Sequence, residues 1–116
     1  MAKRRMFSAE VICTDDFIEL PATAQAIYLQ LGMAADDDGF VANPKMISRS
    51  FRGGFTCLKT LIDKKYLIPF DAGVIVITHW RLSNSIQRDR YTPTKFADEY
   101  KMLILEGNVY EKRGDM

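Results

Sequence analysis

Residues 43–65 read NPKMISRSFRGGFTCLKTLIDKK, and this stretch predicts a helix, a tight turn and a second helix. Asn43 followed by Pro44 is typical of a helix start, because asparagine caps a helix and proline fits its first position. We expect this helix to cover residues 44–51. The apolar side chains that it is expected to turn inward are Met46, Ile47 and Phe51.

Two adjacent glycines, Gly53 and Gly54, predict the turn after this helix. We expect the following helix, the third of the chain, to begin at Thr56, which can cap it, and to reach Lys65. Its buried stripe is predicted to contain Leu58, Leu61 and Ile62. The opposite, solvent-facing side is expected to carry Cys57, Lys59, Thr60, Asp63 and Lys64.

The segments on either side complete the pattern. Residues 20–31 predict the first full helix, with Thr23 as its cap and Ala24, Ile27, Tyr28 and Leu31 at helical spacing. Residues 40–42 are expected to be extended. Residues 66–70 and 74–80 are rich in β-branched and aromatic side chains and predict a hairpin, linked by the turn at residues 71–73.

The predicted order is helix, short strand, helix, turn, helix and hairpin. This order is typical of a winged helix-turn-helix, so we expect an α+β, mainly helical fold with a two- to three-stranded wing. A further C-terminal helix is expected from Lys95 to about Leu105, with Phe96, Tyr100 and Leu103 as one stripe. The expected divisions are an N-terminal arm with a short helical turn (1–20), the winged-helix core (21–80), a basic linker with the C-terminal helix (81–105) and a mobile tail (106–116).

Charge is unevenly distributed along the 116 residues, although the net charge is only +1. Residues 6–44 contain seven acids and no lysine or arginine, whereas residues 45–95 contain ten bases against three acids. Clustered bases on a folded segment favour a polyanion as ligand. We therefore expect a positive face that binds duplex DNA.

The third helix is the predicted DNA-reading element. Groove and phosphate contacts are expected from Lys59, Thr60, Lys64 and Lys65, with Arg49 and Arg52 in support. This helix contains no arginine, so it offers no bidentate arginine contact to guanine. A second basic group is expected to hold phosphates beside it, with Tyr91 available for stacking, and contains Arg81, Arg88, Arg90 and Lys95.

Several functional classes lack their sequence signatures. Cys13 and Cys57 stand alone, the Asp36-Asp37-Asp38-Gly39 run lacks the alternation of a calcium loop, and no phosphate-binding loop is present. His79, the one histidine, has no nucleophile motif to serve. No apolar run is long enough to cross a bilayer. We expect a non-enzymatic, cytoplasmic protein without a cofactor or metal.

Four groups of residues, in this order, resemble the N-terminal domain of replisome-organiser (DnaD-like) replication proteins of phages and prophages of Gram-positive bacteria. They read LPATAQAIY at residues 20–28, DDDGFVANP at 36–44, FDAGVIVITHW at 70–80 and DRYTPT at 89–94. The resemblance implies a winged helix that binds DNA at a phage origin, often self-associates and helps to recruit a helicase loader or helicase. Members usually carry a further C-terminal helical domain, and this sequence stops before one could form. We expect either a naturally short protein or the N-terminal part of a longer one.

Two other functions fit the same pattern. One is a protein-interaction and oligomerisation module, in which the wing or the last helix pairs subunits. The acidic wing tip at residues 71–73 and the apolar segment Val74 to Ile77, expected as a pairing edge, favour this alternative. The other is a phage transcription regulator, which the same fold allows.

Overall fold

The computed structural model describes residues 5–84 and 90–113, a small α+β fold with short antiparallel sheets. The predicted sequence of helix, strand, helix, helix and hairpin is confirmed. In chain order the elements are α1 (Ala9–Ile12), α2 (Asp15–Ile18), α3 (Ala22–Ala34), β1 (Phe40–Val41), α4 (Pro44–Arg49), α5 (Gly54–Asp63), β2 (Leu67–Pro69), β3 (Ile75–Ile77), α6 (Trp80–Ser83), α7 (Ala97–Tyr100), β4 (Leu103–Glu106) and β5 (Val109–Lys112).

The main sheet has the strand order β1-β3-β2, and both pairs are antiparallel. Val76 of β3 lies opposite Phe40 on one side and Ile68 on the other. All three residues of β3 are buried. The expectation that Val74 to Ile77 forms a pairing edge is therefore wrong, because β1 and β2 flank this strand on both sides.

The first full helix, α3, has the buried face that its spacing predicts: Ala24, Ile27, Tyr28 and Leu31 are all buried. It continues past Leu31 to Ala34, although a break at Gly32 was expected. Gly32 lies against the ring of Phe7, and a Cβ atom there would come within 2.6 Å of it. A glycine inside this helix therefore makes room for the N-terminal segment.

A close approach of α4 and α5 explains the glycine pair between them. A Cβ atom on Gly54 would lie 1.7 Å from the backbone carbonyl oxygen of Ser48, so only glycine fits. Gly53, with φ +70°, precedes α5 as its N-cap. The prediction that Thr56 caps this helix is wrong, because α5 has already begun at Gly54.

Two side chains in this region face the opposite way from their predicted orientation. Met46 is 64% exposed, because α4 turns Pro44 and Ser48 inward and leaves the side between them in solvent. Cys57 is buried, because α5 packs against both α3 and α4 and so buries a wider arc than the predicted stripe.

The C-terminal region differs most from the prediction. The expected helix from Lys95 to Leu105 is only the four-residue α7, and β4 and β5 form an antiparallel hairpin after it. Gly107 and Asn108 both have positive φ, which is typical of a two-residue hairpin turn. Tyr110 of β5 is buried in the core. Part of the expected mobile tail is thus a structured strand.

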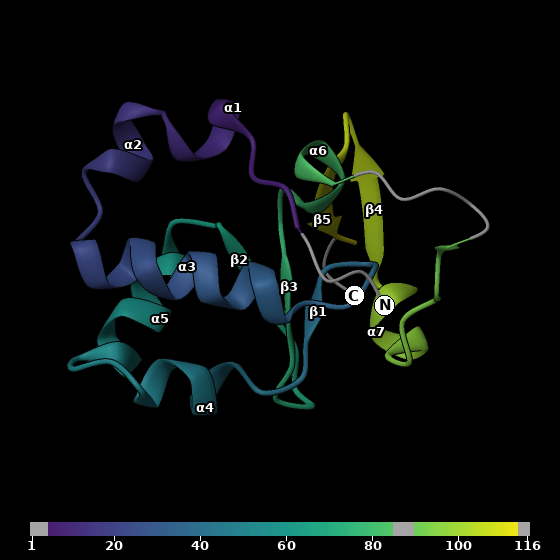
Figure 1. Ribbon diagram of the computed structural model, residues 1–116. Helices are drawn as coiled ribbons and strands as arrows, with labels where there is room; N and C mark the ends of the chain where they lie inside the picture. Colours follow the sequence, from purple (N-terminus) through teal and green to yellow (C-terminus); the bar gives the residue numbers. More distant parts are fainter. Residues whose placement is uncertain (1–4, 85–89, 114–116) are drawn as a thin grey trace.

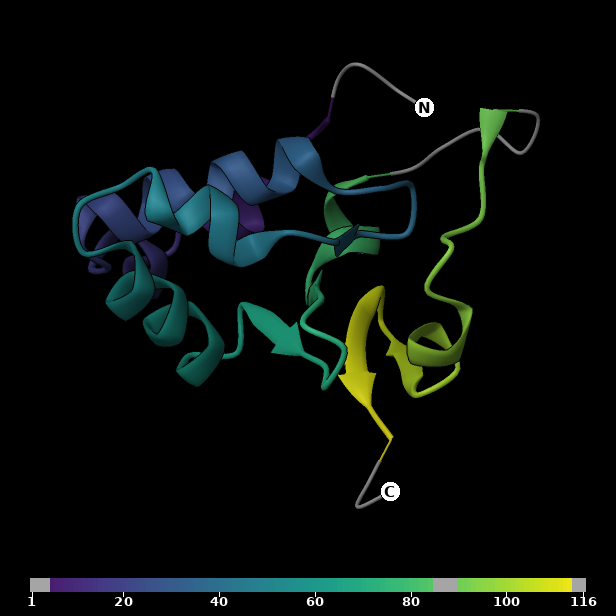
Figure 2. The same ribbon diagram turned by 90° about the horizontal axis from the view of Figure 1, so that it is seen from below.

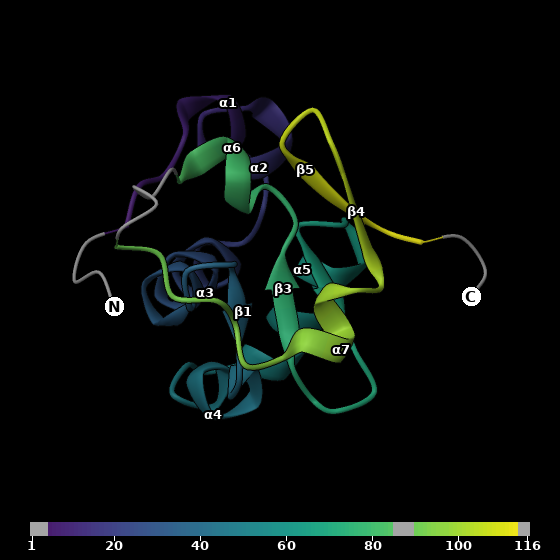
Figure 3. The same cartoon turned by 90° about the vertical axis from the view of Figure 1, so that its right-hand side faces the viewer.

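The main sheet separates two parts of the molecule. Helices α1 to α5 lie on one side of it, and α6, α7 and the β4–β5 hairpin lie on the other (Figures 1 and 2). Figure 3 views the molecule from the end that carries α7 and the hairpin. The described residues contain no helix of the length and apolarity that a bilayer crossing requires.

Candidate nucleic-acid interface

The outer sides of α4 and α5 form a basic surface. Residues 39–62 contain four bases and no acid, and all four basic side chains are exposed. Their positive charge is therefore not compensated within this segment. We call this the α4–α5 surface and define it by the exposed residues Lys45, Met46, Arg49, Arg52, Phe55, Thr56 and Lys59.

An exposed aromatic ring lies within this surface. Phe55, in the first turn of α5, is 51% exposed. The guanidinium carbon of Arg49 lies 5.6 Å from the centre of its ring, which is within range of a cation–π interaction. The two helices thus combine a cation and an apolar group at their outer junction.

The predicted contact residues of α5 separate into two groups. Lys59 is exposed on the outer side. Thr60 is half-buried, and its hydroxyl donates a hydrogen bond to the backbone carbonyl oxygen of Thr56 at 2.9 Å. Lys64 and Lys65 follow the last turn, where Lys65 has a φ of +67°. They therefore lie at the far end of α5 from Arg49 and Arg52.

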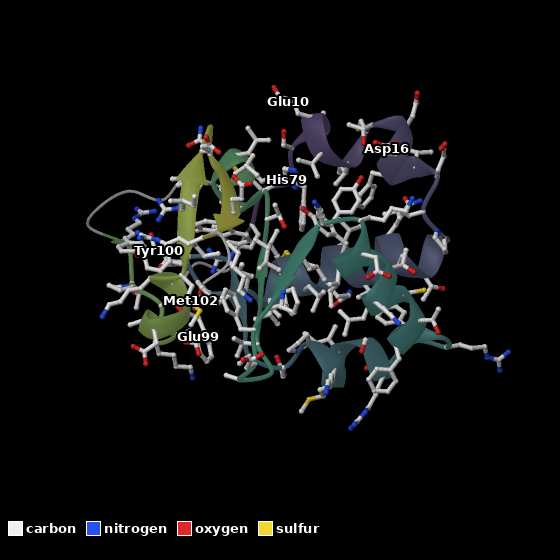
Figure 4. All side chains as sticks on the ribbon, turned by 180° about the vertical axis from the view of Figure 1, so that it is seen from behind. Glu10, Asp16, His79, Glu99, Tyr100 and Met102 are labelled. Carbon is white, nitrogen blue, oxygen red and sulfur yellow. The ribbon has the colours of Figure 1, made fainter. Side chains whose placement is uncertain are left out.

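Lys64 and Lys65 also line a groove of about 830 Å³ along β2. Glu10 and Asp16 line the same groove and are labelled in Figure 4 together with His79. Two further acids, Glu106 and Glu111, and one further base, Lys112, come from the hairpin. Acids and bases in similar number leave this groove with little net field, so its lysines are less suited to attract a polyanion.

Two polar atoms in the groove wall have no hydrogen-bond partner: Oγ1 of Thr78 and Nδ1 of His79. Burial lowers the pKa of His79 below its usual value, so the imidazole is neutral at pH 7. Its ring lies 6.0 Å from that of Tyr66. This environment is that of a packed side chain at the start of α6.

The second basic group does not lie beside α5. Residues 90–96 run at the opposite end of the molecule from α4 and α5 in both perpendicular views (Figures 1 and 2). Arg90 and Lys95 are exposed there, and Arg88 lies outside the described residues. The prediction that this group holds phosphates next to α5 is therefore wrong for its described members.

Arg81 binds groups of the protein itself. Its Nη2 atom donates to Oδ1 of Asp38 at 3.1 Å and to the hydroxyl of Tyr100 at 3.0 Å, and Nε donates to the hydroxyl of Tyr110 at 3.4 Å. Burial works against the charged form, but the tyrosines and Asp38 raise the pKa of the guanidinium above its usual value. These internal contacts leave Arg81 poorly placed for a phosphate.

The turn at residues 36–38, here called the acidic turn, is bound from several distant segments. Oδ1 of Asp36 accepts from the backbone N–H groups of Asp38 and Phe40, each at 3.0 Å. Asp37 pairs with Arg5 at 3.1 Å, and both side chains are buried. The indole of Trp80 donates to the carbonyl oxygen of Asp37 at 2.9 Å. These carboxylates therefore hold the fold together.

The segment at residues 91–94 closes over the acidic turn. The hydroxyl of Tyr91 lies 2.8 and 2.6 Å from the two carboxylate oxygens of Asp38. The backbone N–H of Thr94 donates to Asp38 at 2.8 Å, and its hydroxyl donates to Asp36 at 2.6 Å. The expectation that Tyr91 is available for stacking is therefore not met, because its hydroxyl anchors it here.

Sequence reasoning missed Phe55 and the internal roles of Arg81 and Tyr91. Phe55 falls three residues before Leu58, so its spacing suggests a buried position, and only the end of the packing interface leaves it exposed. For Arg81 and Tyr91 the available signal was the acidic run at residues 36–38. A buried carboxylate requires paired hydrogen-bond donors, which these residues supply.

Comparison with protein-family models, curated proteins and solved structures gives no match. In the described part of the chain, no group of three or more His, Cys, Asp or Glu side chains is arranged to hold a metal ion. The chemistry that remains accessible is the exposed cations and the aromatic ring of the α4–α5 surface.

Proposed function

We propose that this chain is a non-enzymatic DNA-binding module of a phage-type replication-initiation protein, and that it contacts duplex DNA through the α4–α5 surface. The observation that carries the proposal is the run of exposed bases over residues 39–62 without one acid. Neutralising phosphates with lysine and arginine supplies most of the free energy of non-specific DNA binding.

The element order supports a winged-helix interpretation. In this interpretation α4, the glycine turn and α5 are the helix-turn-helix, and β2 and β3 are the wing, with β1 as its third strand. The second helix of such a motif enters the major groove with its N-terminal residues at the base edges. This favours Phe55, Thr56 and Lys59 as groove residues, with Arg49 and Arg52 on the flanking phosphates.

A role in replication is supported by the residue groups behind the resemblance. Three of the four, at 36–44, 70–80 and 89–94, contribute Asp38, Trp80 and Tyr91 to the contacts of the acidic turn. These groups thus belong to one interlocked structural unit. Recruitment of a helicase loader or helicase is the corresponding proposal for the partner.

Fluorescence anisotropy with labelled duplex DNA at several salt concentrations tests the DNA-binding proposal. A variant with Arg49, Arg52 and Lys59 all replaced by alanine should bind much more weakly, and its log–log salt slope should be shallower by about three, roughly one for each lost phosphate contact. The matched control replaces Arg90, Lys95 and Lys101, which are exposed near α7. Equal loss in both variants would show that α4–α5 is not the binding surface.

A second candidate function, self-association, is favoured by the β4–β5 hairpin. Met102, Ile104 and Leu105 are large apolar side chains exposed on and before β4, and Met102 is labelled in Figure 4. Exposed apolar groups on a short strand are a typical pairing surface. Sedimentation of the wild type and of Ile104→Lys at several concentrations tests this. A monomer at every concentration would rule this function out.

A further inference from the structure

Phe55 is the least expected residue of the α4–α5 surface. Burying a phenylalanine removes a large apolar area from water, yet about half of this ring is exposed among cations. Arg49 lies over one part of it, at 5.6 Å from the ring centre. The ring is therefore held at the start of α5 with apolar surface still free.

The other outward side chains of α5 restrict what this helix could read in a DNA groove. Residues 54–63 contain no arginine, asparagine or glutamine, which are side chains that typically read guanine and adenine with paired hydrogen bonds. The groups that face outward in the first half of the helix are Phe55, Thr56 and Lys59. Two of these three offer carbon atoms to a partner.

Apolar groups have one natural counterpart in the major groove, the C5-methyl group of thymine. We propose that Phe55, steadied by Arg49, is a specificity-determining residue that packs against thymine methyl groups and gives the module a preference for A·T base pairs. This inference rests on the proposed function, because it requires α5 to enter the major groove. It adds the class of base that the helix recognises.

The test compares duplexes that differ only in this methyl group. Alternating A·T duplexes of one length are prepared with thymine or with deoxyuridine, and alternating G·C duplexes with cytosine or 5-methylcytosine. Charge and base pairing are the same within each pair. The wild type should bind the methylated member of each pair more tightly, by about fourfold for each methyl group that it buries.

Variants attribute the effect to the ring. Phe55→Ala should bind the methylated and unmethylated duplexes equally, with an affinity near that of the wild type for the unmethylated ones. Met46→Ala removes another exposed apolar side chain of the same surface and should keep the methyl preference. Urea unfolding of each variant verifies that the half-exposed site tolerates the change.

The two failures are distinguishable. Salt-dependent binding by the wild type that ignores the methyl group would overturn the role of Phe55 and leave the DNA-binding function standing. A preference that persists in Phe55→Ala would overturn it as well. No binding to any of the four duplexes would overturn the proposed function itself.

Discussion

Tyr91 and Asp38 are joined across 53 residues of sequence, with the tyrosine hydroxyl 2.8 and 2.6 Å from the two carboxylate oxygens. Asp38 has no exposed surface. A buried carboxylate must be satisfied by hydrogen bonds, and removing one of its donors leaves part of its charge uncompensated. The contact therefore ties the C-terminal third of the chain to the acidic turn.

Replacing Tyr91 by phenylalanine should lower the free energy of unfolding by about 1.5–3 kcal/mol, the range for a hydrogen bond to a charged group. Urea denaturation with an unchanged m-value measures this. Thr92→Ala is the control, because the Thr92 side chain is exposed and only its backbone N–H binds Asp37. A Tyr91→Phe protein as stable as the control would contradict this structural role.

Gly54→Ala should destabilise the protein by more than about 3 kcal/mol, since the added methyl group meets the Ser48 carbonyl oxygen of a tightly packed turn. Gly53→Ala is the comparison: its added methyl meets nothing within 4 Å, and only the left-handed backbone costs about 1–2 kcal/mol. Thermal and urea unfolding measure both. If Gly54→Ala were the milder of the two, the close approach of α4 and α5 would be wrong.

Arg81→Gln should reduce stability by about 1–3 kcal/mol, toward the lower end because the side chain is 35% exposed. Arg90→Gln, at an exposed position, should change it by less than about 0.5 kcal/mol. Neither variant should alter the DNA affinity of the folded protein, because both residues lie away from α4 and α5. A tenfold loss of affinity in Arg81→Gln would instead make it a phosphate contact.

The tyrosines predict a loss of stability at high pH. Burial raises the pKa of Tyr28, Tyr66, Tyr91 and Tyr110, for Tyr110 to about 12, and Asp38 adds to the effect at Tyr91. A raised pKa in the folded state means that the stabilisation is complete below the unfolded value of about 10 and is lost as pH rises through the folded values.

Phenolate absorbance measured against pH tests this. The native protein should require a higher pH than the urea-unfolded protein to reach the same absorbance, and most of the rise should coincide with loss of helical circular dichroism. Coincident native and unfolded titrations would show that these hydroxyls are not buried as described.

Local signals in the sequence predicted most elements of the fold correctly. The spacing of Ala24, Ile27 and Tyr28 and the glycine pair before α5 depend on neighbouring residues, and both predictions are confirmed. The C-terminal helix failed because Phe96 and Tyr100 fit a helical stripe, whereas the turn at Gly107 and Asn108 selects a hairpin.

The candidate site was predicted less well. Arg49, Arg52 and Lys59 are exposed as expected, but the second basic group lies elsewhere. Contacts between residues far apart in sequence determine its place, such as the bond from Arg81 to Asp38. Clustering of like charges along a chain does not reveal which of them are already paired across it.

The central claim is that the α4–α5 surface is where duplex DNA binds, and backbone amide NMR of the labelled protein with added duplex tests it most directly. The account predicts that the largest shift changes fall on residues 45–60. They should fade as salt is raised and should be absent when Arg49, Arg52 and Lys59 are replaced by alanine. Changes concentrated on residues 90–113, or no change at an affinity detectable by anisotropy, would contradict it.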